Sequence, residues 1–173
     1  MNKSIKFISF CLCMTFLFSI VCTSCGQRNH VVSVASCAVD LKDLFTSVKN
    51  ASGALPEMCS FSTLDKDAED CFRCLCDFDY SKVEDYYISY SSSGTAEEIF
   101  LIKLKNSEDS TYAKLSLHNR IKSRSATFDQ YQPGECSKLG KAIIASKGNY
   151  VALLICPDGY SAKQAFESYL STK

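Results

Sequence analysis

Two short helices are predicted near the start of the folded part of the chain, because apolar residues recur there at the helical period. Over residues 39–48 the apolar side chains fall on one face, with a spacing close to 3.6 residues. Gly53 and Pro56 follow and mark the end of this helix. A second apolar stripe covers residues 64–75, and the aspartates at its start suit the positive end of a helix.

Further along, runs of β-forming residues predict four strands in two pairs. Residues 83–90 are rich in tyrosine and branched side chains. In residues 98–105, one set of alternate positions is apolar and the other contains lysines, which indicates one buried face and one partly wet face. Residues 141–146 and 150–156 flank the tight turn 147–149, and the second of these strands is apolar throughout, so we expect it at the centre or covered on both faces.

Two longer helices complete the pattern. One opens at Asn106 and is expected to fade by about Ala126, and another starts near Ser161 with apolar residues at helical spacing. From residue 83 the order is therefore two strands, a helix, two strands and a helix. This order predicts an α+β fold with one antiparallel four-stranded sheet, both helices on one of its faces, and the two short helices before it. Residues 39–173 are expected to form a single domain.

The first 24 residues have the order of an export signal. Lys3 and Lys6 are followed by an uncharged run over residues 7–21, and then by small residues directly before Cys25. The run is shorter than the roughly 20 residues that a membrane span needs. The cysteine after the small pair resembles the bacterial lipobox, although Cys22 stands where that class usually has leucine.

This resemblance implies cleavage before Cys25 and diacylglycerol on its thiol. Residues 25–38 are then a lipidated tether, and the domain is expected on the extracytoplasmic face of the cell membrane, held there by its N-terminal lipid. The alternative is plain secretion, with cleavage near Ser24.

Composition narrows the function classes further. The 173 residues include 19 basic and 19 acidic ones, so the chain lacks the basic excess of a nucleic-acid-binding protein. Of eleven cysteines, three lie in the signal and Cys25 is expected to carry lipid, which leaves an odd number that cannot all pair within one chain.

Four segments carry a resemblance to a known family. They are EEIFLIKLKNSED (97–109), RIKSRSATFDQYQPGE (120–135), KAIIASKGNYVALLICPD (141–158) and AKQAFESYL (162–170). Over roughly residues 39–171 the chain resembles domain of unknown function 4358, a family of small predicted lipoproteins of anaerobic Gram-positive bacteria. The resemblance implies location and fold but brings no catalytic residues.

Cysteines offer one candidate site. Cys71, Cys74 and Cys76 lie close together, with Cys59 twelve positions before the first of them. Cysteines at C-x-x-C spacing can bind zinc or an iron–sulfur cluster, or can form a redox-active disulfide. However, the group falls near the C-terminal end of a predicted helix, where Cys76 points away from the other two. Buried or partly buried thiols are the simpler interpretation, so no metal and no cofactor is assigned.

The sequence contains no recognisable set of residues for acid–base or nucleophilic catalysis. His118 is expected on a solvated helix face together with Ser116, Asn119 and Lys122. The adjacent Glu97–Glu98 pair lies on a predicted strand, where neighbouring side chains point to opposite faces.

Tyrosines suggest a recognition surface instead. Tyr86, Tyr87 and Tyr90 crowd one predicted strand, and such clusters either contact partners or cover a sheet core. We therefore expect a non-catalytic binding or envelope-accessory domain that uses the uncovered sheet face to bind a protein, a peptide or an envelope component. The alternative is a thiol- or metal-dependent protein that uses the cysteine group.

Overall fold

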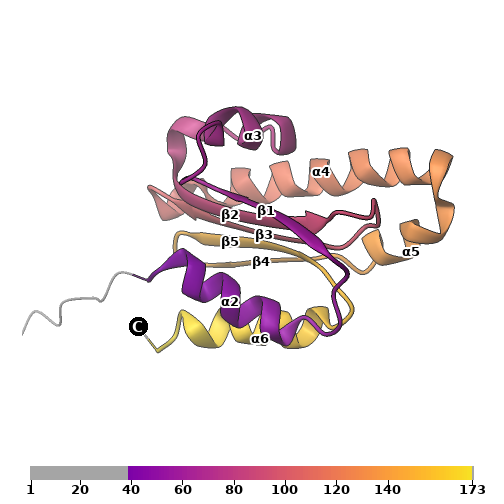
Figure 1. Cartoon of the computed structure of the whole chain (residues 1–173). Helices are drawn as coiled ribbons and strands as arrows, with labels where there is room; N and C mark the ends of the chain where they lie inside the picture. The colour runs from indigo at the N-terminus through magenta and orange to yellow at the C-terminus, as the bar shows by residue number, and fades with distance from the viewer. Residues whose placement is uncertain (1–38, 173) are drawn as a thin grey trace, which may run out of the picture. The chain divides into compact units, whose positions relative to one another are not determined.

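A five-stranded antiparallel sheet lies at the centre of the domain, and helices cover both of its faces (Figure 1). The computed structural model describes residues 39–172. The strands follow the spatial order β1-β2-β3-β5-β4, and every neighbouring pair is antiparallel. Their bounds are β1 Met58–Ser62, β2 Val83–Ser91, β3 Glu98–Leu104, β4 Ile143–Lys147 and β5 Tyr150–Ile155.

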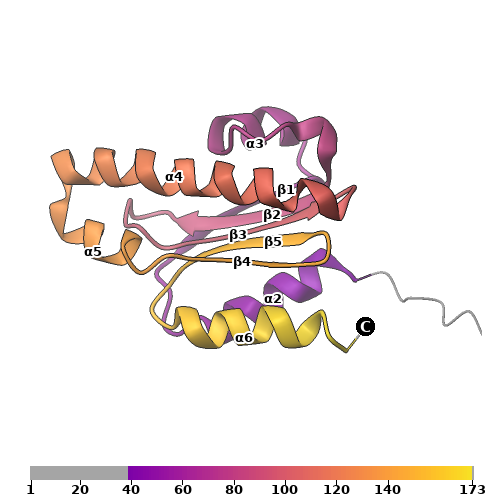
Figure 2. The same ribbon diagram turned by 180° about the vertical axis from the view of Figure 1, so that it is seen from behind.

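Helices form a layer on each side of this sheet. Figures 1 and 2 show α3 and α4 on one face, and α2 and α6 on the other. The α-helices are α2 Leu41–Ala51, α3 Ala68–Leu75, α4 Ser110–Tyr131, α5 Cys136–Leu139 and α6 Gly159–Tyr169, with 3-10 turns at η1 Tyr80–Lys82, η2 Ser107–Asp109 and η3 Pro133–Glu135. No helix within residues 39–172 is both long enough and apolar enough to span a membrane.

Two expectations about the sheet are wrong. It has five strands instead of four, because residues 58–62 pair with β2 as an additional edge strand. This segment is short and rich in serine, so its own pattern carries little strand signal before the partner is in place. The helices also do not share one face.

The reason for the second error lies in the central strands. All six residues of β5 are buried, and so are all residues of β3 except Lys103. A strand that is apolar on both sides needs a layer of structure on each face of the sheet. The α6 helix therefore packs with α2 on the face opposite α4.

Each face has its own hydrophobic core. Phe100 and Ile102 of β3 point into the core under α3 and α4, where Phe72 is fully buried. Ile99 and Leu101 point into the core under α2 and α6. The alternation of β3 thus divides one continuous apolar run between two layers.

The long helix α4 positions the candidate site. It spans 22 residues, and only Ala113, Ser116 and Leu117 of these are buried. Its second half continues past the sheet toward α5, as Figure 2 shows. Two arginines on this half, Arg120 and Arg124, reach the first residue of β3.

Candidate functional site

Two arginines of α4 bind one buried carboxylate. Arg120 and Arg124 lie one helical turn apart, and Glu98 is the first residue of β3. Arg120 donates from Nε to Oε1 of Glu98 at 2.7 Å and from Nη2 to Oε2 at 2.6 Å. Arg124 donates from Nη1 to the same Oε2 at 3.0 Å.

The same arginines also bind backbone carbonyl groups around the site. Nη1 of Arg120 donates to the carbonyl of Leu75 at 2.8 Å, at the end of α3. Such carbonyl groups have no partner within their own helix, so this bond ties α3 to α4. Arg124 donates from Nη1 to the carbonyl of Ala96 at 3.1 Å and from Nη2 to that of Thr95 at 3.5 Å.

Glu98 does not compensate the two guanidinium groups equally. Burial lowers the pKa of Arg120, but the hydrogen bonds and charge of Glu98 outweigh burial and raise it overall. Burial also lowers the pKa of Arg124, and there the attraction of Glu98 does not make up the difference, since Arg120 repels the same charge. Arg124 is therefore the less completely paired cation of the two.

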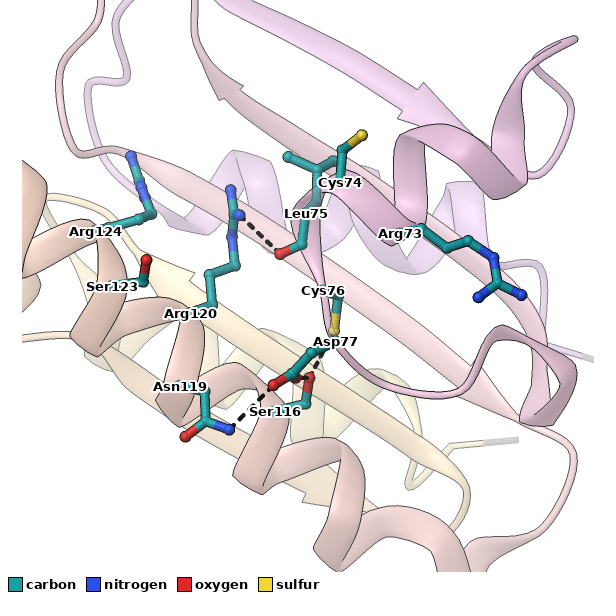
Figure 3. A pocket seen from close by; sticks show the side chains of 10 residues that line it. All are labelled: Arg73, Cys74, Leu75, Cys76, Asp77, Ser116, Asn119, Arg120, Ser123 and Arg124. Carbon is teal, nitrogen blue, oxygen red and sulfur yellow. Dashed lines mark hydrogen bonds between the residues drawn. The ribbon is translucent and has the colours of Figure 1, made fainter.

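A cavity of about 290 Å³ opens beside the arginines, between the end of α3 and α4 (Figure 3). Arg120 and Arg124 form one wall, and Cys76, Asp77, Ser116 and Asn119 line the cavity as well. Arg73 also lines it, but in Figure 3 its side chain points away from the two α4 arginines. It pairs with Glu69 at 2.7 Å on the surface of α3.

Polar groups in this cavity bind one another. Asp77 accepts hydrogen bonds from Ser116 and from Asn119, the latter at 3.2 Å. Ser116 is also 3.1 Å from the sulfur of Cys76. Ser116 is thus buried, which corrects the expectation of a solvated face at this position, whereas His118 is exposed. The Asp77 bond explains how a serine comes to lie inside the domain.

A second cavity of about 360 Å³ lies beside the same arginines. Leu75, Arg120 and Arg124 line both cavities. The second cavity adds the aromatic side chains of Tyr90 and Phe128. The guanidinium carbon of Arg124 is 5.4 Å from the centre of the Phe128 ring, a distance typical of a cation–π contact.

The predicted cysteine site is not assembled in the structure. Cys59 and Cys74 are exposed, Cys71 is half-buried, and Cys76 is buried just after the end of α3. None of the six cysteines between residues 39 and 172 forms a disulfide. Over the same range, no group of three or more His, Cys, Asp or Glu side chains is arranged to hold a metal ion.

Burial raises the pKa of the Cys76 thiol, which accordingly favours its neutral form. Cys25, the predicted lipidation site, lies outside the described residues.

The three candidate tyrosines do not form one surface. Tyr86 is fully buried and donates its hydroxyl to the carbonyl of Ala68 at 2.7 Å, so its assignment as a surface residue is wrong. Tyr87 points to the opposite face of the sheet, with its ring centre 4.2 Å from that of Phe45. Tyr90 lines the second cavity. The period of two along β2 explains this separation.

Sequence reasoning missed Glu98, Arg120 and Arg124 as a unit. Glu97 and Glu98 were expected to point apart, and they do bind different cations, since Glu97 pairs with Lys138 at 2.8 Å. One signal was available: two arginines four residues apart share a helix face, and a carboxylate heads an otherwise apolar strand. No sequence rule, however, places that face over that strand end.

Comparison with known proteins identifies a family and nothing more specific. No curated protein and no solved structure matches the chain. One family matches residues 59–156, a segment that contains Glu98, Arg120 and Arg124. The chain therefore belongs to the family described as Domain of unknown function (DUF4358).

Proposed function

We propose that this protein is a membrane-anchored extracytoplasmic lipoprotein whose domain binds an anionic ligand without catalysis. The observation that carries the proposal is the pair of α4 arginines, which share a single carboxylate in the wall of two cavities. Because helices cover both faces of the sheet, we place binding in these cavities instead of on an open sheet face.

Support for the anchor comes from the leader alone. The charged start, the short apolar run and the small residues before Cys25 are typical of a lipidated export signal. Intact mass spectrometry of the membrane-extracted protein tests this part. We expect a chain that begins at Cys25 with acyl mass attached, and an unmodified chain that still begins at Met1 would refute it.

Support for an anionic ligand comes from the chemistry of the arginines. Guanidinium groups bind carboxylates and phosphates through paired N–H donors, and these charge-assisted bonds are stronger than neutral ones. Cavities of this size can hold a small organic molecule or part of a larger one. Burial from solvent further strengthens the attraction between the arginines and an anion.

Support for a role without catalysis comes from the side chains around the cavities. Neither cavity is lined by a histidine. The buried thiol of Cys76 has a raised pKa, which disfavours the nucleophilic thiolate. Asp77 accepts hydrogen bonds from Ser116 and Asn119, which hold its carboxylate within the polar network of the domain itself.

Thermal unfolding of the purified full-length protein tests the proposal. A ligand that binds only the folded state raises the melting temperature, and the stabilisation grows with the logarithm of the ligand concentration once that concentration exceeds the Kd. We expect small organic anions and inorganic phosphate, as a class, to raise it more than neutral or cationic analogues. Arg124→Gln should abolish this effect.

Arg73→Gln is the matched control, because Arg73 lines the same cavity but is directed away from the site. It should leave the stabilisation unchanged. If no anion raises the melting temperature, or if Arg124→Gln responds like the wild type, the proposed binding site is wrong.

A further inference from the structure

Resting on the proposed anion site, we infer that its ligand is a monocarboxylate with a flat apolar group. The carboxylate binds the free edge of Arg124, and the apolar group lies in the second cavity against Tyr90 and Phe128. Three features of the site lead to this conclusion: the donors that remain unused, the local charge, and the distribution of apolar side chains.

Unused donors form a complete carboxylate-binding edge on Arg124. A guanidinium presents five N–H groups, two of which, on Nε and Nη2, lie side by side along one edge. Arg120 uses both donors of this edge to bind Glu98. Arg124 instead meets Glu98 and two carbonyls with Nη1 and one Nη2 hydrogen, which leaves its Nε–H and second Nη2–H free.

The Nε atom of this free edge is accessible to solvent. Among residues 39–172, no buried side-chain nitrogen or oxygen lacks a hydrogen-bond partner, so the unpaired Nε of Arg124 is accessible from outside. Arg124 lines both cavities. A ligand carboxylate can therefore bind Arg124 through the same two-bond geometry that Glu98 already makes with Arg120.

Local charge favours a single negative group. The charged side chains that line the second cavity are Glu98, Arg120 and Arg124, two cations against one anion. Lys138 with its partners Glu97 and Glu135 lies outside both cavity walls and adds no positive charge to the neighbourhood. One excess cation matches a monocarboxylate better than a phosphate ester, which carries more negative charge.

Of the two cavities, only the second is lined by aromatic side chains. In the second cavity, Leu75, Tyr90 and Phe128 are half-buried and pack against the edge of the core. The first cavity is instead lined by polar groups that bind one another. A flat apolar group beside the carboxylate would cover the exposed parts of Tyr90 and Phe128, and this burial adds affinity.

The experiment uses the full-length protein, labelled with ¹⁵N and extracted in detergent, with 3-phenylpropanoate as the probe. Acetate lacks its ring, 3-phenylpropan-1-ol lacks its carboxylate, and inorganic phosphate replaces its anion. Titrations follow the arginine Nε–H signals and the backbone amides of Tyr90 and Phe128 by NMR. We expect 3-phenylpropanoate to bind at least about tenfold more tightly than each of the other three compounds.

Two variants separate the paired donors from simple charge. Arg124→Lys keeps the positive charge but loses the two-bond edge. It should weaken binding of 3-phenylpropanoate at least about tenfold, as should Arg124→Gln, while Arg73→Gln stays within about twofold. An unchanged dispersion of the amide signals shows that each variant is folded.

Different failures have different meanings. If acetate or phosphate binds as well as 3-phenylpropanoate, or if Arg124→Lys retains wild-type affinity, the inferred ligand is wrong while an anion site persists. If the uncharged alcohol binds as well as 3-phenylpropanoate, the inferred ligand and the proposed anion site are both wrong. If no anion shifts the Arg124 signal, the inferred ligand and the proposed anion site are both wrong.

Discussion

Replacing Glu98 by glutamine gives the most direct test of the site architecture. The side chain keeps its size and one acceptor oxygen but loses its charge. Both guanidinium groups then lose their counter-charge at once, because Arg120 and Arg124 bind the same carboxylate. The new amide N–H₂ group also faces two donors and has nothing to bind.

The expected loss follows from burial. Removing one partner of a buried ion pair costs about 3–5 kcal/mol, because the remaining charge stays unpaired in a poorly solvated place. Glu98 is fully buried, but the side chains of Arg120 and Arg124 remain 13% and 17% exposed, so water can relieve part of the cost. We therefore expect Glu98→Gln to lower the free energy of unfolding by about 3 kcal/mol.

Urea unfolding, followed by far-ultraviolet circular dichroism, measures this loss. Glu84→Gln is the matched control, since Glu84 pairs with Lys103 at 2.6 Å on an exposed part of β2. Surface ion pairs contribute at most about 1 kcal/mol, so the control should lose no more than that. Equal denaturant slopes for the variants and the wild type would show that the unfolding transition itself is unchanged.

A double-mutant cycle with Arg124→Gln decides whether the reasoning is right. In the wild type, Arg124→Gln removes one bond to Glu98 and two to backbone carbonyls, and should cost about 1 kcal/mol or more. In the Glu98→Gln background the same change removes an uncompensated cation beside Arg120, so it should cost less or even stabilise the protein. A loss under about 1 kcal/mol for Glu98→Gln, or a larger cost of Arg124→Gln in its background, would refute the account.

Four further predictions address the rest of the domain. Phe72→Ala should cost about 3–5 kcal/mol in urea unfolding, because the fully buried ring touches three other aromatic rings, and a loss below 1 kcal/mol would contradict this. Gly53→Ala should lower the free energy of unfolding more than Gly148→Ala. Both glycines have positive φ, but a Cβ at position 53 comes within 3.3 Å of a proline side chain, whereas one at position 148 has open space. Equal losses in the two variants would count against the packing argument. Burial alone raises the pKa of Glu97, but hydrogen bonds from a lysine and a threonine lower it more, so its net pKa is depressed. The stabilisation from Glu97 is therefore lost as pH falls below the ordinary glutamate range. The free energy of unfolding should fall less steeply with decreasing pH in Glu97→Gln than in the wild type, and identical pH profiles would contradict this prediction. Dialysis against EDTA should leave the melting temperature unchanged, because no metal-binding group is arranged within residues 39–172, and a fall on metal removal would revive the cysteine hypothesis.

Most elements of the fold could be predicted because the residues within each element carry its signal. The α2 helix begins where expected: Asp40 accepts hydrogen bonds from the backbone N–H groups of Lys42 and Asp43 and so caps its start. Strand β5 is buried at every residue, as its unbroken apolar run indicated. These features depend on neighbours within one helical turn or one strand, and sequence alone displays them.

Strand β1 could not be predicted in this way. Its residues Met58–Ser62 are mixed in character, and their strand conformation depends on hydrogen bonds to β2, about thirty positions further along the chain. The end of α4 was likewise expected near Ala126, but the helix continues to Tyr131, where η3 and α5 turn back against it. In both cases a distant partner decides the local structure.

The candidate site shows the same division more clearly. The cysteine group drew attention because its spacing is conspicuous, yet the end of α3 at Leu75 sends Cys76 into the core and leaves Cys74 outside. The tyrosines of β2 are close in sequence, but successive positions of a strand face opposite layers, so Tyr87 lies on the other side of the sheet from Tyr86 and Tyr90. Spacing along a chain indicates a site only when the element that carries it also directs the side chains together.

By itself, the amino-acid sequence determined the α+β class, the paired strands, the helix periods and the expectation of a lipid anchor, since all of these rest on local patterns. Only the tertiary structure decided that helices cover both sheet faces and that Arg120 and Arg124 meet Glu98 more than twenty residues away. The physical reason is that a buried charge must find its partners in three dimensions, and the packing of α4 across the sheet determines which groups lie within hydrogen-bonding distance.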